Sequence, residues 1–164
     1  MSMSLIDKVR YASEDEARGI LEGYIKAESE GNFEKVKNML ISFLKSPERK
    51  VRRAALGALR TTKFVDRDII TTCAIMTKED PEKSVRDLAA EVTLELLNVE
   101  DEGLKKDLTK SIIKLISKGK AMVDVTDIVK SIGIDFARSI VEDPEVDSQT
   151  KEYIQFAIEY LEKG

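Results

Sequence analysis

The chain has 164 residues, of which 42% are hydrophobic and 5% aromatic, and its formal net charge is −4. This length and apolar content are enough for one well-cored domain and short for two, so we expect a single domain over residues 1–164. The chain has no histidine and a single cysteine, Cys73, which excludes an internal disulfide, the Ser-His and Cys-His nucleophile pairs and the usual zinc sites.

We expect the chain to lie in the cytoplasm and outside any membrane. Residues 1–7 lack the basic start and the long apolar stretch of a signal peptide. The longest charge-free segment of the mid-chain helices, Ile69 to Thr77, falls far short of the roughly 20 apolar residues that cross a bilayer.

Apolar residues at helical spacing predict a series of helices, and eight glycines and three prolines leave little material for the turns of an all-β fold. Ser4, Ser13 and Asn32 are expected N-caps, each followed by a helix. The dipeptide Ser46-Pro47 ends the third of these helices, and a helix from Glu48 to about Thr61 comes next.

Asp66 opens a segment through Lys78 for which a helix is favoured over a strand, although its threonines lower the helix propensity. Pro81 is expected at the first position of a helix that runs to about Asn98. Three more helices are expected. The first covers residues 101–119, the second begins at the cap Thr126 and continues through Gly133 to Val141, and the third begins at the cap Ser148 and ends at Lys163. The chain is therefore predicted to be all-α, with about eight helices.

Two segments of the chain repeat at a spacing of 34 residues: Ser46-Pro47-Glu48-Arg49-Lys50-Val51-Arg52 returns as Asp80-Pro81-Glu82-Lys83-Ser84-Val85-Arg86. Repeats of this length are typical of helical arrays. The two segments resemble the second-helix signature of HEAT repeats, in which a proline turn leads into Val-Arg and then small residues. The resemblance covers residues 45–98, with a fainter copy at 148–157. It implies a HEAT/armadillo-like solenoid, a right-handed α-α superhelix, in a family that mostly binds proteins, less often nucleic acids, and shares no catalytic residues.

The sharpest candidate for a binding site is a basic block over residues 45–67, which holds eight cationic side chains against two anionic ones. On a helical wheel, Arg49, Arg53 and Arg60 fall within a sector of about 40°, opposite the alanines of the same helix. We call these three residues the arginine stripe. Together with Lys50 and Arg52 they are the predicted partner-binding residues, because guanidinium groups bind carboxylates or phosphates in bidentate geometry.

Two interpretations of the arginine stripe stay open: it binds a partner, or it is the ordinary surface of a helix paired with neighbouring Glu and Asp. A partner is expected to be an acidic protein surface rather than nucleic acid, since Asp87 and Glu91 interrupt the stripe in the next repeat and no aromatic residue is interleaved for base stacking. Arg52 and Arg86, at equal positions after their prolines, are expected to pair with an acidic group of the preceding turn or helix.

The helix over residues 148–163 is apolar around an arc of about 200°, wider than the roughly 100° stripe of a surface helix. Tyr153, Phe156 and Tyr160, which we call the aromatic face, are the predicted oligomer contact. Three interpretations stay open: the tyrosine hydroxyls lie at the rim of an ordinary core face, another element such as the N-terminal helix covers the face, or a second copy of the chain forms a homodimer.

The sequence therefore predicts a non-catalytic protein-interaction module or scaffold, and nucleic-acid binding through residues 49–60 is the alternative. It contains no Gly-rich phosphate loop and no cysteine cluster, and we expect no enzyme activity, no metal and no other cofactor. Cys73 is expected to be a small buried core residue.

Overall fold

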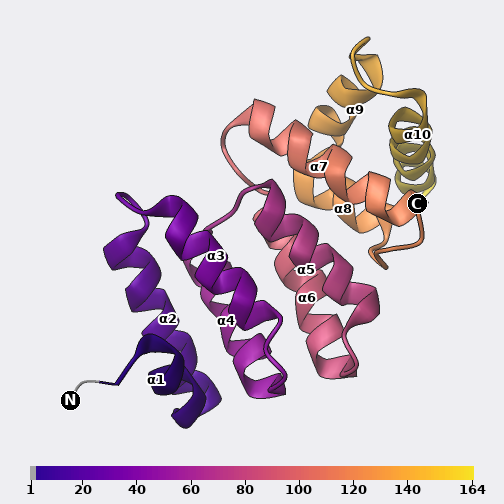
Figure 1. The fold of residues 1–164 in the computed structure, drawn as a ribbon. Helices are drawn as coiled ribbons and strands as arrows, with labels where there is room; N and C mark the ends of the chain where they lie inside the picture. Colours follow the sequence, from indigo (N-terminus) through magenta and orange to yellow (C-terminus); the bar gives the residue numbers. More distant parts are fainter. Residues whose placement is uncertain (1–2) are drawn as a thin grey trace.

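The computed structural model describes residues 3–164, and within this range the chain forms ten α-helices and no strand. The all-α prediction is confirmed, and residues 67–79 form a helix rather than a strand. In chain order (Figure 1) the helices are α1 (Leu5–Tyr11), α2 (Glu14–Glu28), α3 (Phe33–Leu44), α4 (Arg49–Thr62), α5 (Arg67–Glu79), α6 (Lys83–Leu96), α7 (Glu102–Ser117), α8 (Val125–Ile132), α9 (Ile134–Glu142) and α10 (Ser148–Lys163).

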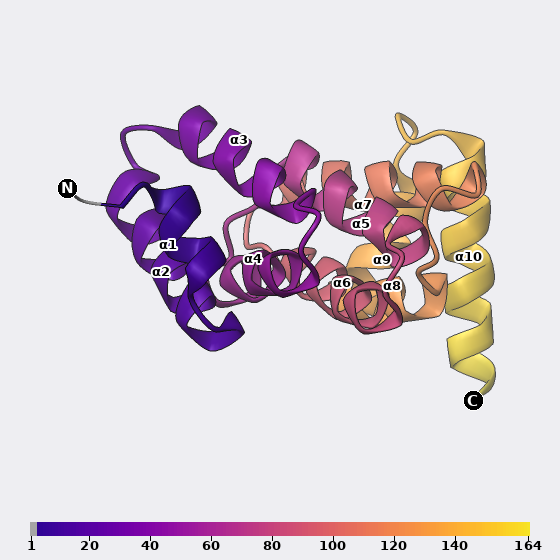
Figure 2. The same cartoon turned by 60° about the horizontal axis from the view of Figure 1, so that its bottom comes forward.

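The helices pack in two rows, in the order in which they follow along the chain. One row joins α2 to α4, α4 to α6 and α6 to α8, and the other joins α3 to α5 and α5 to α7. Figure 2 shows α3, α5 and α7 above α4, α6 and α8, with the two ends of the chain on opposite sides of the molecule. Helix α1 packs on α2 at one end, and α10 packs on α8, α9 and α7 at the other.

The space between the rows is filled by one connected cluster of buried apolar side chains to which all ten helices contribute. Helix α4 lies in the middle of its row and buries Ala54, Ala55 and Ala58 almost completely. Small residues at these positions allow close packing of α4 against its neighbours α2, α3 and α6. Leucine and isoleucine supply most of the largest fully buried side chains, so the core is aliphatic.

Short polar side chains cap four of the helices at the residues that the sequence predicts. The side-chain oxygens of Ser13, Asp66 and Asp101 each accept a hydrogen bond from the backbone N–H three residues on, at 3.2, 2.9 and 2.9 Å. Ser4 does the same for α1, whereas Asn32 stands at the cap position of α3 without a side-chain bond. Local sequence thus sets most helix starts.

The predicted continuous helix through Gly133 is wrong. Gly133 has a φ of +89° and lies between α8 and α9, ending the first helix and preceding the second. A side chain disfavours this backbone conformation, which is why glycine occupies the position. This break divides one expected helix into α8 and α9, and residues 3–164 form ten helices where about eight were expected.

Three predicted helix starts are displaced by one or two residues. Pro81 lies in the turn before α6, which begins at Lys83 with Glu82 as its cap residue. Helices α8 and α10 are capped by Asp124 and Asp147, because the carboxylate of an aspartate accepts from the first-turn backbone N–H groups. The predicted caps, at positions 126 and 148, are instead residues inside these helices.

A buried lysine with three carboxylate partners connects α3 to the start of α5. Lys37 Nζ lies 2.8 Å from Asp68 Oδ2, 3.0 Å from Glu34 Oε2 and 3.1 Å from Asp66 Oδ2. Hydrogen bonds to Asp68, then Glu34 and Asp66, raise the pKa of the Lys37 ammonium above its ordinary value. The lysine is therefore held charged at the junction of the two helices.

None of the helices formed by residues 3–164 is both long and apolar enough to cross a lipid bilayer.

Candidate functional site

The arginine stripe lies along α4 and faces carboxylates that α2 and α6 supply. Arg53 Nε is 3.0 Å from Glu14 Oε1 of α2, and Arg53 Nη1 donates to the backbone carbonyl of Ser84 at 2.9 Å. Arg60 Nε is 2.9 Å from Glu95 Oε2 of α6. These ion pairs run from α4 to the helices on both sides, so they hold the row together.

The third member of the stripe, Arg49, has only a distant partner. Its Nη1 atom lies 4.0 Å from Glu82 Oε2, and both side chains are largely exposed. An exposed pair at this distance contributes little to stability. Arg49 is therefore the stripe residue whose guanidinium group is most available to a partner.

The other two predicted partner-binding residues, Lys50 and Arg52, are occupied within the chain. Lys50 Nζ donates to the backbone carbonyls of Arg10 and Ala12, both at 2.6 Å, which ties α4 to the end of α1. Arg52 is buried and forms a bidentate pair with Asp80, in which Nε–Oδ2 is 2.8 Å and Nη2–Oδ1 is 3.1 Å. Both contacts indicate structural roles.

The expectation that Arg52 and Arg86 pair with an acidic group of the preceding turn or helix is wrong in its direction for Arg52 and in the kind of acceptor for Arg86. Asp80, the partner of Arg52, lies in the following turn, 28 residues later. Arg86 Nη1 donates instead to the backbone carbonyl of Asp80 at 2.7 Å. Asp80 thus receives both arginines: it is the first residue of the second copy of the repeated segment and lies in the turn between α5 and α6.

A charged hollow of about 380 Å³ lies beside the stripe, lined by Glu14, Arg18, Arg53, Gly57 and Arg60 among others. Arg18 packs directly over Gly57: a Cβ atom at position 57 would lie 2.7 Å from Arg18 Cδ. Arg18 itself pairs within α2, so each arginine here already has a carboxylate neighbour. As a partner-binding site the stripe stays a prediction.

The aromatic face of α10 is largely open to solvent. Phe156 is 73% exposed and Tyr160 63%, whereas Tyr153 is half-buried. The opposite side of the same helix buries Ile154, Ala157 and Ile158 against the molecule. The N-terminal helix does not cover the face, since α1 packs at the far end (Figure 2).

An apolar groove of about 500 Å³ runs between the turns of the repeated segments. Leu44, Pro47, Ile75, Met76 and Pro81 line it together with the buried Arg52–Asp80 pair. The two prolines come from the two copies of the repeat, so the groove marks the junction between successive helix pairs.

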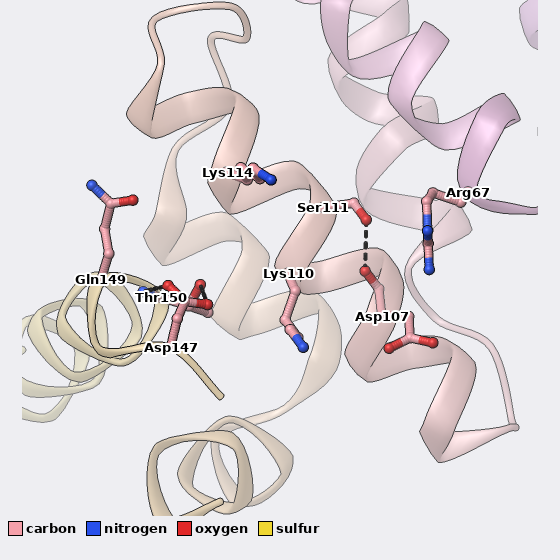
Figure 3. A pocket seen from close by; sticks show the side chains of 8 residues that line it. All are labelled: Arg67, Asp107, Lys110, Ser111, Lys114, Asp147, Gln149 and Thr150. Carbon is pink, nitrogen blue, oxygen red and sulfur yellow. Dashed lines mark hydrogen bonds between the residues drawn. The ribbon is translucent and has the colours of Figure 1, made fainter. Parts of the chain in front are cut away.

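A third hollow, of about 400 Å³, lies where α5, α7 and the start of α10 meet (Figure 3). Its lining is polar and we call it the cationic pocket; it consists of Arg67, Asp107, Lys110, Ser111, Lys114, Asp147, Gln149 and Thr150. Sequence reasoning missed this site because its members lie far apart along the chain. The signal that was present is the pair of lysines one helical turn apart on α7.

Two aspartates in the loop before α10 have a pKa below the ordinary value. Hydrogen bonds from the backbone N–H and the hydroxyl of Thr150 lower the pKa of Asp147. The bond from Lys106 lowers the pKa of Asp143 and raises that of Lys106, tying α7 to the loop. Each aspartate is thereby held ionised in a fixed position.

Within residues 3–164, no three cysteine or acidic side chains gather as the ligands of a metal ion would. Cys73 is fully buried, as expected, and burial raises the pKa of its thiol to about 12. Comparison with protein-family models, with curated proteins and with solved structures gives no match.

Proposed function

We propose that the chain is a non-catalytic protein-interaction module built as a HEAT-like, right-handed solenoid over residues 1–164. Two features support the repeat architecture. The helices pack in chain order in two rows, and the Arg52–Asp80 pair joins the two copies of the segment that repeats at 34 residues. Stacked arrays of this kind present long continuous surfaces, which suit the binding of other proteins.

The observation that carries the proposal is the exposed pair Phe156 and Tyr160. They lie one turn apart on α10, so their exposed rings project from the same face of the helix. Aromatic side chains of this size are enriched in the centres of protein interfaces, where their burial contributes most of the binding free energy. Charged side chains at Glu152 and Glu159 flank the patch, as the polar rim of an interface does.

The partner we propose is a protein that places an apolar surface on this patch, and a second copy of the chain is one such partner. The arginine stripe is a separate predicted contact for an acidic surface. It is less well supported, because Arg53 and Arg60 would first have to leave Glu14 and Glu95. The same pairing weakens the nucleic-acid alternative, since phosphates would compete with carboxylates already in place.

The test compares three baits in affinity capture from native extract: the wild-type chain, Phe156→Ser/Tyr160→Ser, and Tyr11→Ser. Tyr11 is 75% exposed on α1, at the opposite end of the molecule. Tyr11→Ser is therefore a control that also removes an exposed aromatic ring but leaves α10 unchanged. Partners retained by wild type and Tyr11→Ser but lost from the double variant support the proposal. Identical capture by all three baits contradicts it.

Light scattering distinguishes the homodimer from a different partner. A mass that doubles with concentration for wild type and Tyr11→Ser, but stays at one chain for the double variant, identifies a second copy. The stripe is tested separately by Arg49→Glu/Arg53→Glu/Arg60→Glu, and nucleic acid by a mobility-shift titration at low ionic strength. Tight oligonucleotide binding that the triple variant abolishes would favour the alternative function.

A further inference from the structure

Three cationic side chains line the cationic pocket. Arg67 is the first residue of α5, and Lys110 and Lys114 lie one turn apart on α7 (Figure 3). Like charges at this spacing on a helix repel each other. The concentration of positive charge is unexpected in a chain whose net charge is −4.

Within residues 3–164 these cations form no direct ion pair with a carboxylate, although the charge of Lys110 contributes to lowering the pKa of Asp147. In the part that the structure describes, residues 3–164, none of the three lies within 4 Å of an acidic oxygen. Arg67 is the exception among nine arginines: each of the others in this range forms an ion pair or donates a hydrogen bond. The pocket therefore holds donors that are left for a ligand.

The two aspartates of the pocket do not balance this charge. Asp147 caps α10: its carboxylate accepts from the backbone N–H of Thr150 at 3.0 Å and from the Thr150 hydroxyl at 2.7 Å. Asp107 is the second acidic residue of the lining, so three positive charges face two negative ones. A ligand that brings negative charge lowers the repulsion between the cations.

The remaining polar groups of the pocket are suited to an oxygen-rich anion. The Ser111 hydroxyl donates to the backbone carbonyl of Asp107 at 2.9 Å (Figure 3), so the side-chain amide of Gln149 is the uncharged donor that the lining adds. The first turn of α10 brings the positive end of a 16-residue helix to the same place. A guanidinium group and two ammonium groups together match the several oxygens of a phosphoryl group.

We propose that the cationic pocket binds a phosphoryl group, either as free phosphate or on a small phosphorylated molecule. The volume of about 400 Å³ lies in the range of small-molecule sites. The three cations line a single hollow, which favours a compact ligand over a nucleic-acid strand. This inference is independent of the protein-interaction function.

The test is an NMR titration of the ¹⁵N-labelled chain with inorganic phosphate, with glucose 6-phosphate and with glucose, at constant ionic strength. We expect saturable shifts of the Ser111, Gln149 and Thr150 amides with both phosphorylated probes and none with glucose. Tighter binding of glucose 6-phosphate identifies a phosphorylated molecule as the ligand class, and tighter binding of phosphate identifies the free anion.

Two variants locate the binding. Arg67→Gln, on an exposed side chain, and Lys110→Gln/Lys114→Gln are each expected to weaken phosphate binding by at least about tenfold, because charge-assisted hydrogen bonds are lost. Lys35→Gln/Lys130→Gln is the matched control: it removes the same charge at two exposed lysines outside the pocket. The affinity of this control variant for phosphate should stay within about twofold of that of the wild-type chain.

Three results would overturn the proposal. The first is the absence of saturable shifts with both phosphorylated probes. The second is an equal loss of affinity in Lys35→Gln/Lys130→Gln and Lys110→Gln/Lys114→Gln, which would indicate a general charge effect. The third is a single-stranded oligonucleotide that binds these residues more tightly than both small probes. Retention of the wild-type spectrum outside the pocket shows that each variant is folded.

Discussion

The buried pair Arg52–Asp80 offers the sharpest test of how the repeated segments are joined. Its side chains are 8% and 3% exposed, and the guanidinium group also donates to the backbone carbonyls of Ser46 and Pro47 at 3.0 and 3.1 Å. In Asp80→Ala, Arg52 keeps its hydrogen bonds to the two backbone carbonyls but loses the carboxylate that balances its charge. The backbone N–H of Glu82 also loses its acceptor. Removing one partner of a buried ion pair costs about 3–5 kcal/mol, because an uncompensated charge remains.

This cost is measurable by urea unfolding followed by circular dichroism. With a denaturant dependence of about 2 kcal/mol per molar urea, the midpoint of Asp80→Ala should fall by roughly 2 M. The double variant Arg52→Met/Asp80→Ala should be more stable than Asp80→Ala, since the buried charge is then gone.

Arg86→Met is the control, because Arg86 occupies the equivalent position in the second copy of the repeat but makes only one bond to a backbone carbonyl. Its loss should lower the free energy of unfolding by about 1 kcal/mol. The reasoning is refuted if Arg86→Met costs as much as Arg52→Met, or if the effects of Arg52→Met and Asp80→Ala simply add in the double variant.

Three further variants or reactions test individual features. Gly133→Ala should lower the free energy of unfolding by about 1–3 kcal/mol, because φ is +89° there; a wild-type urea midpoint would contradict this. Cys73, whose pKa burial raises to about 12, should resist iodoacetamide at pH 8 until urea unfolds the chain, and rapid labelling of the native protein would be inconsistent with its burial. The hydrogen bonds from Thr150 lower the pKa of Asp147, so its cap stabilises α10 above the ordinary carboxyl pKa and is lost as the pH falls through the lowered value. Asp147→Ala should therefore lower the free energy of unfolding by about 1 kcal/mol at pH 7. The difference in this free energy between wild type and variant, measured by urea unfolding, should become smaller below about pH 4; a difference that does not change with pH would contradict the prediction.

Features encoded within a few residues were predictable from the sequence. Ser13, Asp66 and Asp101 begin helices where expected, because a cap needs only its own side chain and a backbone N–H three residues away. The break at Gly133 was not predicted, because the apolar periodicity used to find helices does not detect it. The apolar stripe continues across it, and periodicity carries no information about the backbone angles of one glycine.

The surroundings of the candidate sites depend on residues distant in sequence. A helical wheel places Arg53 and Arg60 on one side of their helix, but it does not show that Glu14 and Glu95 meet them there. In the same way, Lys110 is recognisable as part of a site only once α5 and α10 are placed beside α7. Such neighbours follow from the packing of the helices, which local patterns do not fix.

The order in which the helices pack has a consequence for how the molecule opens. Helices α4 and α6 each pack between two other helices of their row. Helix α1 packs chiefly on α2 at one end of the molecule, and α10 lies at the opposite end. Local unfolding therefore needs the least free energy at the two ends and the most in the middle. A protein bound to α10 would hold closed a segment that otherwise frays, while leaving the motion of the distant end unchanged.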